Sequence, residues 1–176
     1  YPIHPTYKYL SYTHRCDYLR SYLMYHYGGG YTDIKHNKFS WINFFDTINN
    51  TNQQMVGYAE LRSTDIASSD PNVRSAFRLL PGMGHFLFRK YSKIAKEWIV
   101  AVNNILDTKS EQIIKNPGTY HPRAIYGGVF QSKGFEGSKY PLGWNEILGS
   151  ILHPIFYQHI GNYELTMPYP QMSNYR

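Results

Sequence analysis

The residues with the most chemical potential are an acidic and basic pair near the start of the chain and the glycine-rich segment that follows it. Asp17 and Arg20 are three residues apart, which places them at neighbouring positions on a helix. The run Gly28–Gly30 then precedes a segment that contains Asp33 and Lys35. A carboxylate accepts hydrogen bonds from hydroxyl groups and a cation attracts phosphate, so this combination suits a sugar attached to a phosphate. The plainer interpretation is an ion pair on a helix surface followed by a turn.

The segment that positions these residues is predicted to be a helix followed by a short strand. Ser11 or Thr13 can cap a helix over residues 13–27, and Gly28 lies where a left-handed C-terminal cap is preferred. A strand over residues 30–34 is expected next. The helix is expected to bury an apolar stripe at helical spacing, made of Cys16, Leu19, Leu23 and Tyr27.

The rest of the chain alternates between helical and extended patterns. The predicted elements are, in order, a helix at 41–48, a strand at 54–59, a polar loop at 60–74, a strand at 84–89, a helix that Ser92 caps and that extends toward Lys115, an irregular stretch at 117–143, and a helix at 144–156 that meets Pro154. Strands that alternate with helices predict an α/β layer fold, here as one domain over residues 1–176.

Composition indicates a globular protein and says little about its partners. The chain is 42% hydrophobic and 17% aromatic, and no run approaches the roughly 18 apolar residues that cross a bilayer. The net charge of +6 attracts polyanions, but the basic residues are scattered and no nucleic-acid motif occurs, so no nucleic-acid partner is expected. The single cysteine, Cys16, excludes an internal disulfide and is expected to be buried. A reducing, cytoplasmic location is slightly favoured, with a Golgi or membrane-associated one left open.

The segment from Cys16 to Asp33 resembles the sugar-binding region of DXD-type glycosyltransferases. That group includes the capsular polysaccharide synthesis and initiating mannosyltransferase-like enzymes and the glucosylating clostridial toxins. Their pattern is a helix with Asp-x-x-Arg followed by Tyr-Gly-Gly-x-Tyr-x-Asp-x-Asp. The matching residues here are Asp17, Arg20, Gly28, Gly29, Tyr31 and Asp33. The resemblance is specific over residues 13–35 and looser at Trp41, at Gly57 and Tyr58, at 143–146 and at His153-Pro154.

The resemblance implies a GT-A fold and transfer of a hexose from a nucleotide-sugar donor, with retention, to a glycan or other hydroxyl acceptor. It also implies that Asp17 and Arg20 hold hydroxyls of the donor sugar. Gly28, Gly29 and Gly30 would let the backbone approach the donor, while Tyr31 would pack below the sugar or phosphate and Asp33 would act as a catalytic and metal-binding residue. Because no hydrophobic strand precedes residue 13, we expect the N-terminal nucleotide-binding strands of such a domain to be missing from this chain.

One position departs from the family pattern. Lys35 stands where the second aspartate, the more direct ligand of Mn²⁺ or Mg²⁺, is expected. A charged Lys cannot ligate a cation, but it can place a positive charge beside the diphosphate. Three interpretations stay open: Lys35 replaces the metal, a metal binds through Asp33 and later ligands, or the site is degenerate.

Residues from the second half of the chain could complete the site. Glu146 and His153 are seven residues apart and would share a helix face, so both are candidate metal ligands, with Glu146 also a catalytic candidate. Trp144 could stack on the donor, although core packing explains it nearly as well. The stretch at 117–143 is the candidate acceptor loop.

Two further hypotheses compete with a catalytic hexosyltransferase. Lys35 and the expected missing strands would also fit a catalytically degenerate module that binds a nucleotide sugar or carbohydrate. Exposed aromatic and basic residues would fit a nucleic-acid-binding protein, which would show a steep salt dependence of binding. His85 is expected to be a structural histidine with satisfied hydrogen bonds.

Overall fold

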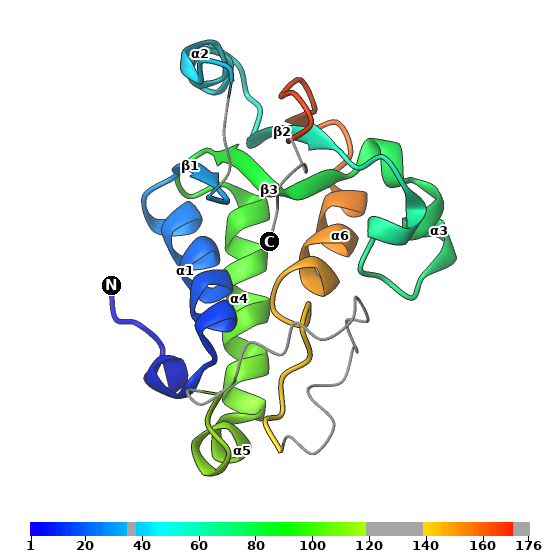
Figure 1. The fold of residues 1–176 in the computed structure, drawn as a ribbon. Coiled ribbons are helices and arrows are strands. Elements are labelled where there is room, and N and C mark those ends of the chain that lie inside the picture. The colour runs from blue at the N-terminus through cyan, green and yellow to red at the C-terminus, as the bar shows by residue number, and fades with distance from the viewer. Residues whose placement is uncertain (35–37, 119–138, 171–176) are drawn as a thin grey trace.

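A computed structural model describes residues 1–34, 38–118 and 139–170 of the chain. The fold is α/β, with helices packed around a mixed four-stranded sheet in the order β1-β3-β2-β4 (Figure 1). The strands are β1 (Gly29–Thr32), β2 (Met55–Ala59), β3 (Pro81–Phe88) and β4 (Tyr163–Glu164). Strand β3 runs antiparallel to both β1 and β2, whereas β2 and β4 are parallel.

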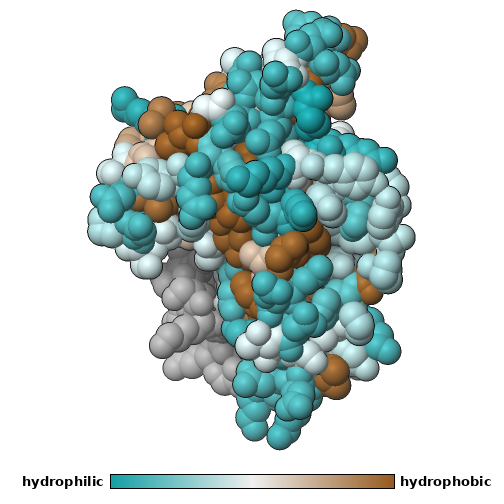
Figure 2. All heavy atoms as spheres, turned by 180° about the vertical axis from the view of Figure 1, so that it is seen from behind, coloured by the Kyte–Doolittle hydropathy of each residue, from teal (hydrophilic) through white to brown (hydrophobic). Residues whose placement is uncertain are grey.

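The helices carry most of the remaining chain. They are α1 (Tyr12–His26), α2 (Ile42–Asn50), α3 (Pro71–Ser75), α4 (Lys93–Thr108), α5 (Ser110–Lys115) and α6 (Gly149–Gln158), with 3-10 segments η1 (Pro5–Tyr9), η2 (Ser63–Asp65) and η3 (Phe77–Leu79). No helix among the described residues is long and apolar enough to cross a membrane. Figure 2 shows the face opposite to that of Figure 1, where groups of hydrophobic residues lie among hydrophilic ones.

The predicted helix ends agree with the structure where the capping residues are well defined. The Ser11 hydroxyl accepts the backbone N–H of His14 at the start of α1, and the Ser92 hydroxyl accepts that of Ala95 at the start of α4. Gly28, with φ of +68°, follows α1 in the left-handed conformation. The chain can therefore turn at once from α1 into the edge strand β1.

Two apolar clusters cover the two faces of the sheet. Helices α1, α4 and α6 lie side by side on one face, and α2 lies on the other (Figure 1). The larger cluster includes Phe86 and Phe88 of β3 and Trp98 of α4, none of them more than 1% exposed. The smaller cluster, on the α2 side, includes Val56 and Leu87. The apolar spacing predicted for α4 is confirmed, because its residues at helical spacing are buried.

The predicted apolar stripe of α1 is wrong, and so is the predicted burial of Cys16. Cys16 is exposed, and Leu23 and Tyr27 are 43% and 58% exposed. The helix instead turns inward a face that contains His14, Asp17, Tyr18, Ser21, Tyr22 and Met24. His14 and Ser21 have hydrogen-bond partners and Asp17 pairs with Arg20, so the most apolar stripe does not decide which face is buried.

Two boundaries also differ from those predicted. Helix α6 begins at Gly149, five residues later than predicted, and continues through Pro154. The polar segment at 60–74 is not entirely irregular, because the Asp70 carboxylate accepts the N–H of Asn72 and caps the short helix α3. These short elements depend on local caps, which the hydrophobic periodicity does not reveal.

Candidate functional site

Asp17 and Arg20 form a buried ion pair on the inner face of α1. The distance from Arg20 Nη2 to Asp17 Oδ1 is 3.2 Å, and the two side chains are 11% and 2% exposed. This contact lacks hydrogen-bond geometry, and no residue in the described ranges hydrogen-bonds Asp17 Oδ1. A buried carboxylate oxygen without a hydrogen-bond donor is costly, and the nearby charge of Arg20 offsets part of that cost.

Arg20 connects α1 to the strands β1 and β3. Its guanidinium group lies 4.2 Å from the centre of the Tyr31 ring, and its Nη1 donates to the carbonyl oxygen of Met83 at 3.3 Å. The distance from Nη2 to Asp33 Oδ1 is 3.9 Å. Asp17 and Asp33, which come from different elements, therefore share one cation.

Asp33 is fixed at the end of β1 by its backbone and its side chain. Its N–H donates to the Gly84 carbonyl at 2.8 Å, which extends the pairing of β1 with β3. The Tyr31 hydroxyl donates to Asp33 Oδ1 at 2.7 Å. Because residues two apart on a strand point to the same face, the two side chains meet above Arg20. The sequence prediction that residues 17, 20, 31 and 33 come together agrees with this geometry.

Burial changes the acid–base properties of Asp17. Removal from water raises the pKa of its carboxyl group to about 7, an effect that Arg20 opposes and Asp33 reinforces. Near neutral pH this carboxyl group therefore exchanges a proton readily. It can donate or accept a hydrogen bond, which suits a partner with several hydroxyl groups.

Gly28, Gly29 and Gly30 differ in the local structure around each Cβ position. A Cβ on Gly28 would lie 2.6 Å from the backbone nitrogen of Lys90, and one on Gly30 would lie 2.6 Å from the Trp41 ring. Gly29 has φ of +91° and no atom within 4 Å of a Cβ position. Close packing thus explains Gly28 and Gly30, while the space beside Gly29 is open.

The candidates from the second half of the chain lie in other environments. Glu146 accepts the N–H of Gly143 at 2.8 Å and pairs with Lys109, the residue between α4 and α5. His153 Nδ1 accepts the N–H of Ala67 at 3.0 Å. Burial lowers the pKa of His153 to about 4, although the backbone of Pro81 and then Asp65 act in the opposite direction, so the ring is neutral at pH 7.

The metal set proposed from the sequence is not gathered in the described part of the chain. Over residues 1–34, 38–118 and 139–170, no group of three or more His, Cys, Asp or Glu side chains is placed to hold an ion. Trp144 is 45% exposed. Lys35 and most of the candidate acceptor loop at 117–143 lie outside the described residues.

Sequence reasoning missed a polar network beside Asp17. His14 Nε2 lies 3.0 Å from the Gly143 carbonyl oxygen, so this nitrogen carries a proton and donates. The His14 Nδ1 atom is 3.0 Å from the Tyr140 hydroxyl, which also accepts the Ser11 N–H. The spacing of three residues between His14 and Asp17 was an available signal for a shared face. The network ties the 140–143 segment to α1, next to the ion pair.

His85 and Asp65 have partners away from the Asp17–Arg20 pair. His85 is fully buried, and its Nε2 hydrogen-bonds the Pro168 carbonyl oxygen at 2.9 Å, which agrees with a structural role. Asp65 pairs with Arg62 at 3.0 Å.

Comparison with known proteins does not assign this chain to a family, so its function is argued from the chemistry of the site. No protein-family model, curated protein or solved structure matches this chain. The geometry itself offers two carboxyl groups, a guanidinium group and a phenol to one ligand, with an open glycine nearby. Such a set can orient several hydroxyl groups and can stabilise a developing negative charge.

Proposed function

We propose that this protein is a glycosyltransferase of GT-A-like fold that transfers a hexose from a nucleotide-sugar donor to a hydroxyl group, with retention of configuration. The observation that carries the proposal is the position of the Arg20 guanidinium group. Asp17 from α1, and Tyr31 and Asp33 from β1 and its end, surround it. These are the residues whose pattern resembles the sugar-binding region of DXD-type enzymes. The raised pKa of the Asp17 carboxyl group, which burial causes, is a further feature that is frequent at functional sites.

Each residue has a role that its contacts allow. Asp17 accepts hydrogen bonds from hydroxyl groups of the donor hexose, and Arg20 is positioned to donate to the same sugar with the part of its guanidinium group that Met83 does not use. Tyr31 holds Asp33 in place through its hydroxyl group and supports Arg20 through its ring.

The reaction replaces one bond at the anomeric carbon by another on the same face. The bond from this carbon to the diphosphate oxygen breaks, the bond to the acceptor oxygen forms, and the acceptor proton passes to the departing phosphate. Negative charge grows on the leaving group, so cations beside it lower the barrier. Arg20 is one such cation, and Lys35 is a second candidate from the sequence.

A divalent cation would act at the same diphosphate if one binds. The described residues supply Asp33 alone at this position, and its Oδ1 atom is already engaged by Tyr31 and faces Arg20. This donor set does not by itself fit Mn²⁺ or Mg²⁺. The assay below therefore compares turnover with Mn²⁺ and with chelator.

Donor turnover tests the proposal directly. Wild-type protein is incubated with UDP-, GDP- and ADP-hexoses, with Mn²⁺ or with chelator, and the released sugar is measured. Asp33→Asn should lower the rate by about 100-fold, because it weakens the anionic partner of both Tyr31 and Arg20. Asp46→Asn, at an exposed position on α2, is the matched control.

The outcomes separate the two leading hypotheses. Turnover that falls in Asp33→Asn but not in Asp46→Asn supports the transferase. Tight binding of one nucleotide sugar without turnover would favour the degenerate binding module, for which the lysine at position 35 is the motivating observation. Equal rates in wild type and Asp33→Asn would count against the role given to Asp33.

A further inference from the structure

A second buried carboxyl group lies on the far side of β3 from Arg20. Glu60 follows β2 directly and is only 8% exposed, and its backbone N–H donates to the Leu80 carbonyl at 3.0 Å. No residue in the described ranges hydrogen-bonds or ion-pairs with its carboxyl group. Its oxygens are not among the fully buried polar atoms of the described residues, so a hydroxyl group of a ligand can reach them in place of water.

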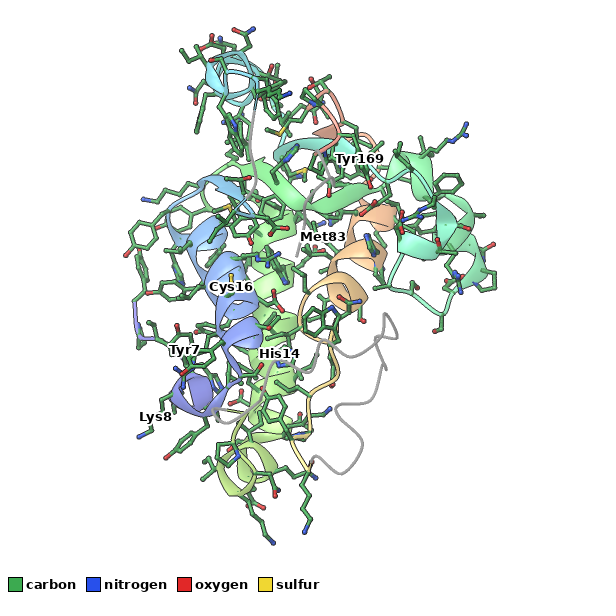
Figure 3. All side chains as sticks on the ribbon, in the orientation of Figure 1. Tyr7, Lys8, His14, Cys16, Met83 and Tyr169 are labelled. Atoms are coloured by element: carbon green, nitrogen blue, oxygen red, sulfur yellow. The ribbon has the colours of Figure 1, made fainter. Side chains whose placement is uncertain are left out.

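An irregular stretch of β3 brings this carboxyl group toward the donor site. Gly57 pairs with Phe86 and Ala59 with Pro81, so β3 contains three more residues than β2 in this interval. The extra residues form an arch whose Met83 carbonyl oxygen faces Arg20. Figure 3 shows Met83 on the helix side of β3 and Tyr169 on the opposite side. Such register shifts commonly redirect side chains beside functional sites.

The Tyr58 ring fills space in the arch, and both carboxyl groups lie close enough to act on the pKa of its hydroxyl group. Its ring occupies the space where a Cβ on Gly82 would lie, and its hydroxyl accepts the Gly84 N–H at 3.0 Å. A Cβ on Gly84 would lie 3.0 Å from this hydroxyl and 3.8 Å from Asp33 Oδ2. Within the described ranges the Tyr58 hydroxyl donates to no residue. Burial raises the pKa of Tyr58, and the charges of Glu60 and Asp33 both add to the rise.

The groups around Glu60 define the chemistry of a ligand. Burial raises the pKa of Glu60 to about 7, Asp65 adds to the rise and Arg62 opposes it. The Tyr169 ring lies edge-on to Tyr58 with ring centres 5.2 Å apart. Asp65 is already paired with Arg62. Two phenols and a carboxyl group without a free cation suit a neutral ligand rich in hydroxyl groups, because phosphate or an acidic sugar would be repelled.

We propose that Glu60, with the hydroxyl groups of Tyr58 and Tyr169, forms the acceptor subsite and binds hydroxyl groups of a neutral sugar. This inference rests on the proposed transferase function. The arch places the subsite next to Asp33, so an acceptor bound there approaches the donor hexose from the side opposite α1. The Tyr58 hydroxyl can donate to the acceptor, and Glu60 can accept from it. The aromatic faces exclude water from the sugar ring.

The test measures transfer and hydrolysis in the same reaction. Methyl α- and β-glucosides, galactosides and mannosides serve as acceptors, and both the transfer product and the free sugar are quantified. Glu60→Gln should lower the ratio of transfer to hydrolysis by about tenfold or more, mainly through a higher KM for the acceptor. Glu111→Gln, at an exposed position on α5, should leave the ratio unchanged.

A binding measurement makes the inference independent of turnover. Saturation-transfer NMR should detect one or more of the methyl glycosides on wild-type protein, with a signal lost in Glu60→Gln and kept in Glu111→Gln. Equal acceptor KM in wild type and Glu60→Gln would overturn the subsite while leaving the transferase standing. Absence of hydrolysis with intact, Glu60-dependent glycoside binding would overturn the transferase and keep a sugar site. Absence of any glycoside binding would overturn the subsite.

Discussion

Replacing Asp17 with Asn should remove one identifiable contribution to the pH dependence of stability. The carboxyl group has an ordinary pKa of 3.8 and a pKa of about 7 in the folded protein. A group whose pKa rises on folding stabilises the fold below its unfolded pKa, and this stabilisation is lost as the pH rises through the folded pKa. The free energy of unfolding should therefore contain a contribution from Asp17 that falls between pH 4 and pH 8.

The size of this contribution follows from the two pKa values. Between pH 5 and pH 8 a carboxyl group shifted from 3.8 to about 7 loses about 3 kcal/mol of stabilisation. Glu60, whose pKa is also raised to about 7, likewise lowers the free energy of unfolding as the pH rises. His153 acts in the opposite sense, because its pKa is lowered to about 4 and the fold loses stability as the pH falls below 6.5. Only a comparison with the variant isolates Asp17.

Urea unfolding of wild type and Asp17→Asn at pH 5 and pH 8 provides that comparison. The change in free energy of unfolding between the two pH values should be about 3 kcal/mol more negative for wild type than for Asp17→Asn. Asp46→Asn, on the exposed side of α2, should behave as wild type. A difference below about 0.5 kcal/mol would show that Asp17 titrates normally. That result would contradict the raised pKa of Asp17 on which the proposed donor site depends.

Three other substitutions test the geometry of the site and of the turn before β1. Arg20→Lys keeps the charge but loses the planar contact with Tyr31 and the second donor, so kcat/KM for the nucleotide sugar should fall by about 10- to 100-fold; an unchanged value would contradict the role of the guanidinium group. Tyr31→Phe removes the hydroxyl that bonds the neighbouring carboxylate and should lower kcat/KM by about tenfold with little change in Tm, whereas a matching loss of Tm would indicate a structural role. Gly28→Ala, whose Cβ would lie 2.6 Å from the Lys90 nitrogen, should lower Tm several-fold more than Gly29→Ala. The Gly29 substitution has no such contact and costs only the roughly 1 kcal/mol of a positive φ. Equal losses of Tm in the two variants would rule out the steric explanation.

Much of the secondary structure follows from local rules in the sequence. The caps at Ser11 and Ser92 and the glycine after α1 set helix ends that the structure reproduces. Helix α4 has a strong apolar periodicity, and its predicted buried face is the one observed. These features depend on residues close together in the chain, so the sequence alone can indicate them.

The orientation of α1 could not be predicted by the same rule. Its inner face buries polar residues such as His14, Asp17 and Ser21, while Leu23 lies at the surface. A periodicity argument places apolar residues inside and fails where a site requires polar ones. The Asp-x-x-Arg spacing indicates the buried face of α1 correctly, whereas the apolar stripe indicates a different face.

The contacts between distant segments were beyond sequence reasoning for a different reason. The Met83 carbonyl reaches Arg20, and Tyr58 reaches Gly84, only because the register of β3 shifts between its pairings with β2. The pair Gly82 and Gly84 hints at an irregular strand, but their sequence does not give its register. The position of Glu60 relative to Asp33 depends on that shift.

The exposed thiol of Cys16 would report ligand occupancy of the proposed donor site. The Sγ atom lies 3.9 Å from Arg20 Nη2 and 4.0 Å from the Tyr31 hydroxyl, beside two residues of that proposed site. It is the only cysteine in the sequence, so alkylation with a maleimide or a disulfide reagent labels this position alone. The rate of labelling follows the access of the reagent, and a bound sugar nucleotide would shield the thiol. Titrating candidate donors against that rate yields dissociation constants without knowledge of the acceptor or the product.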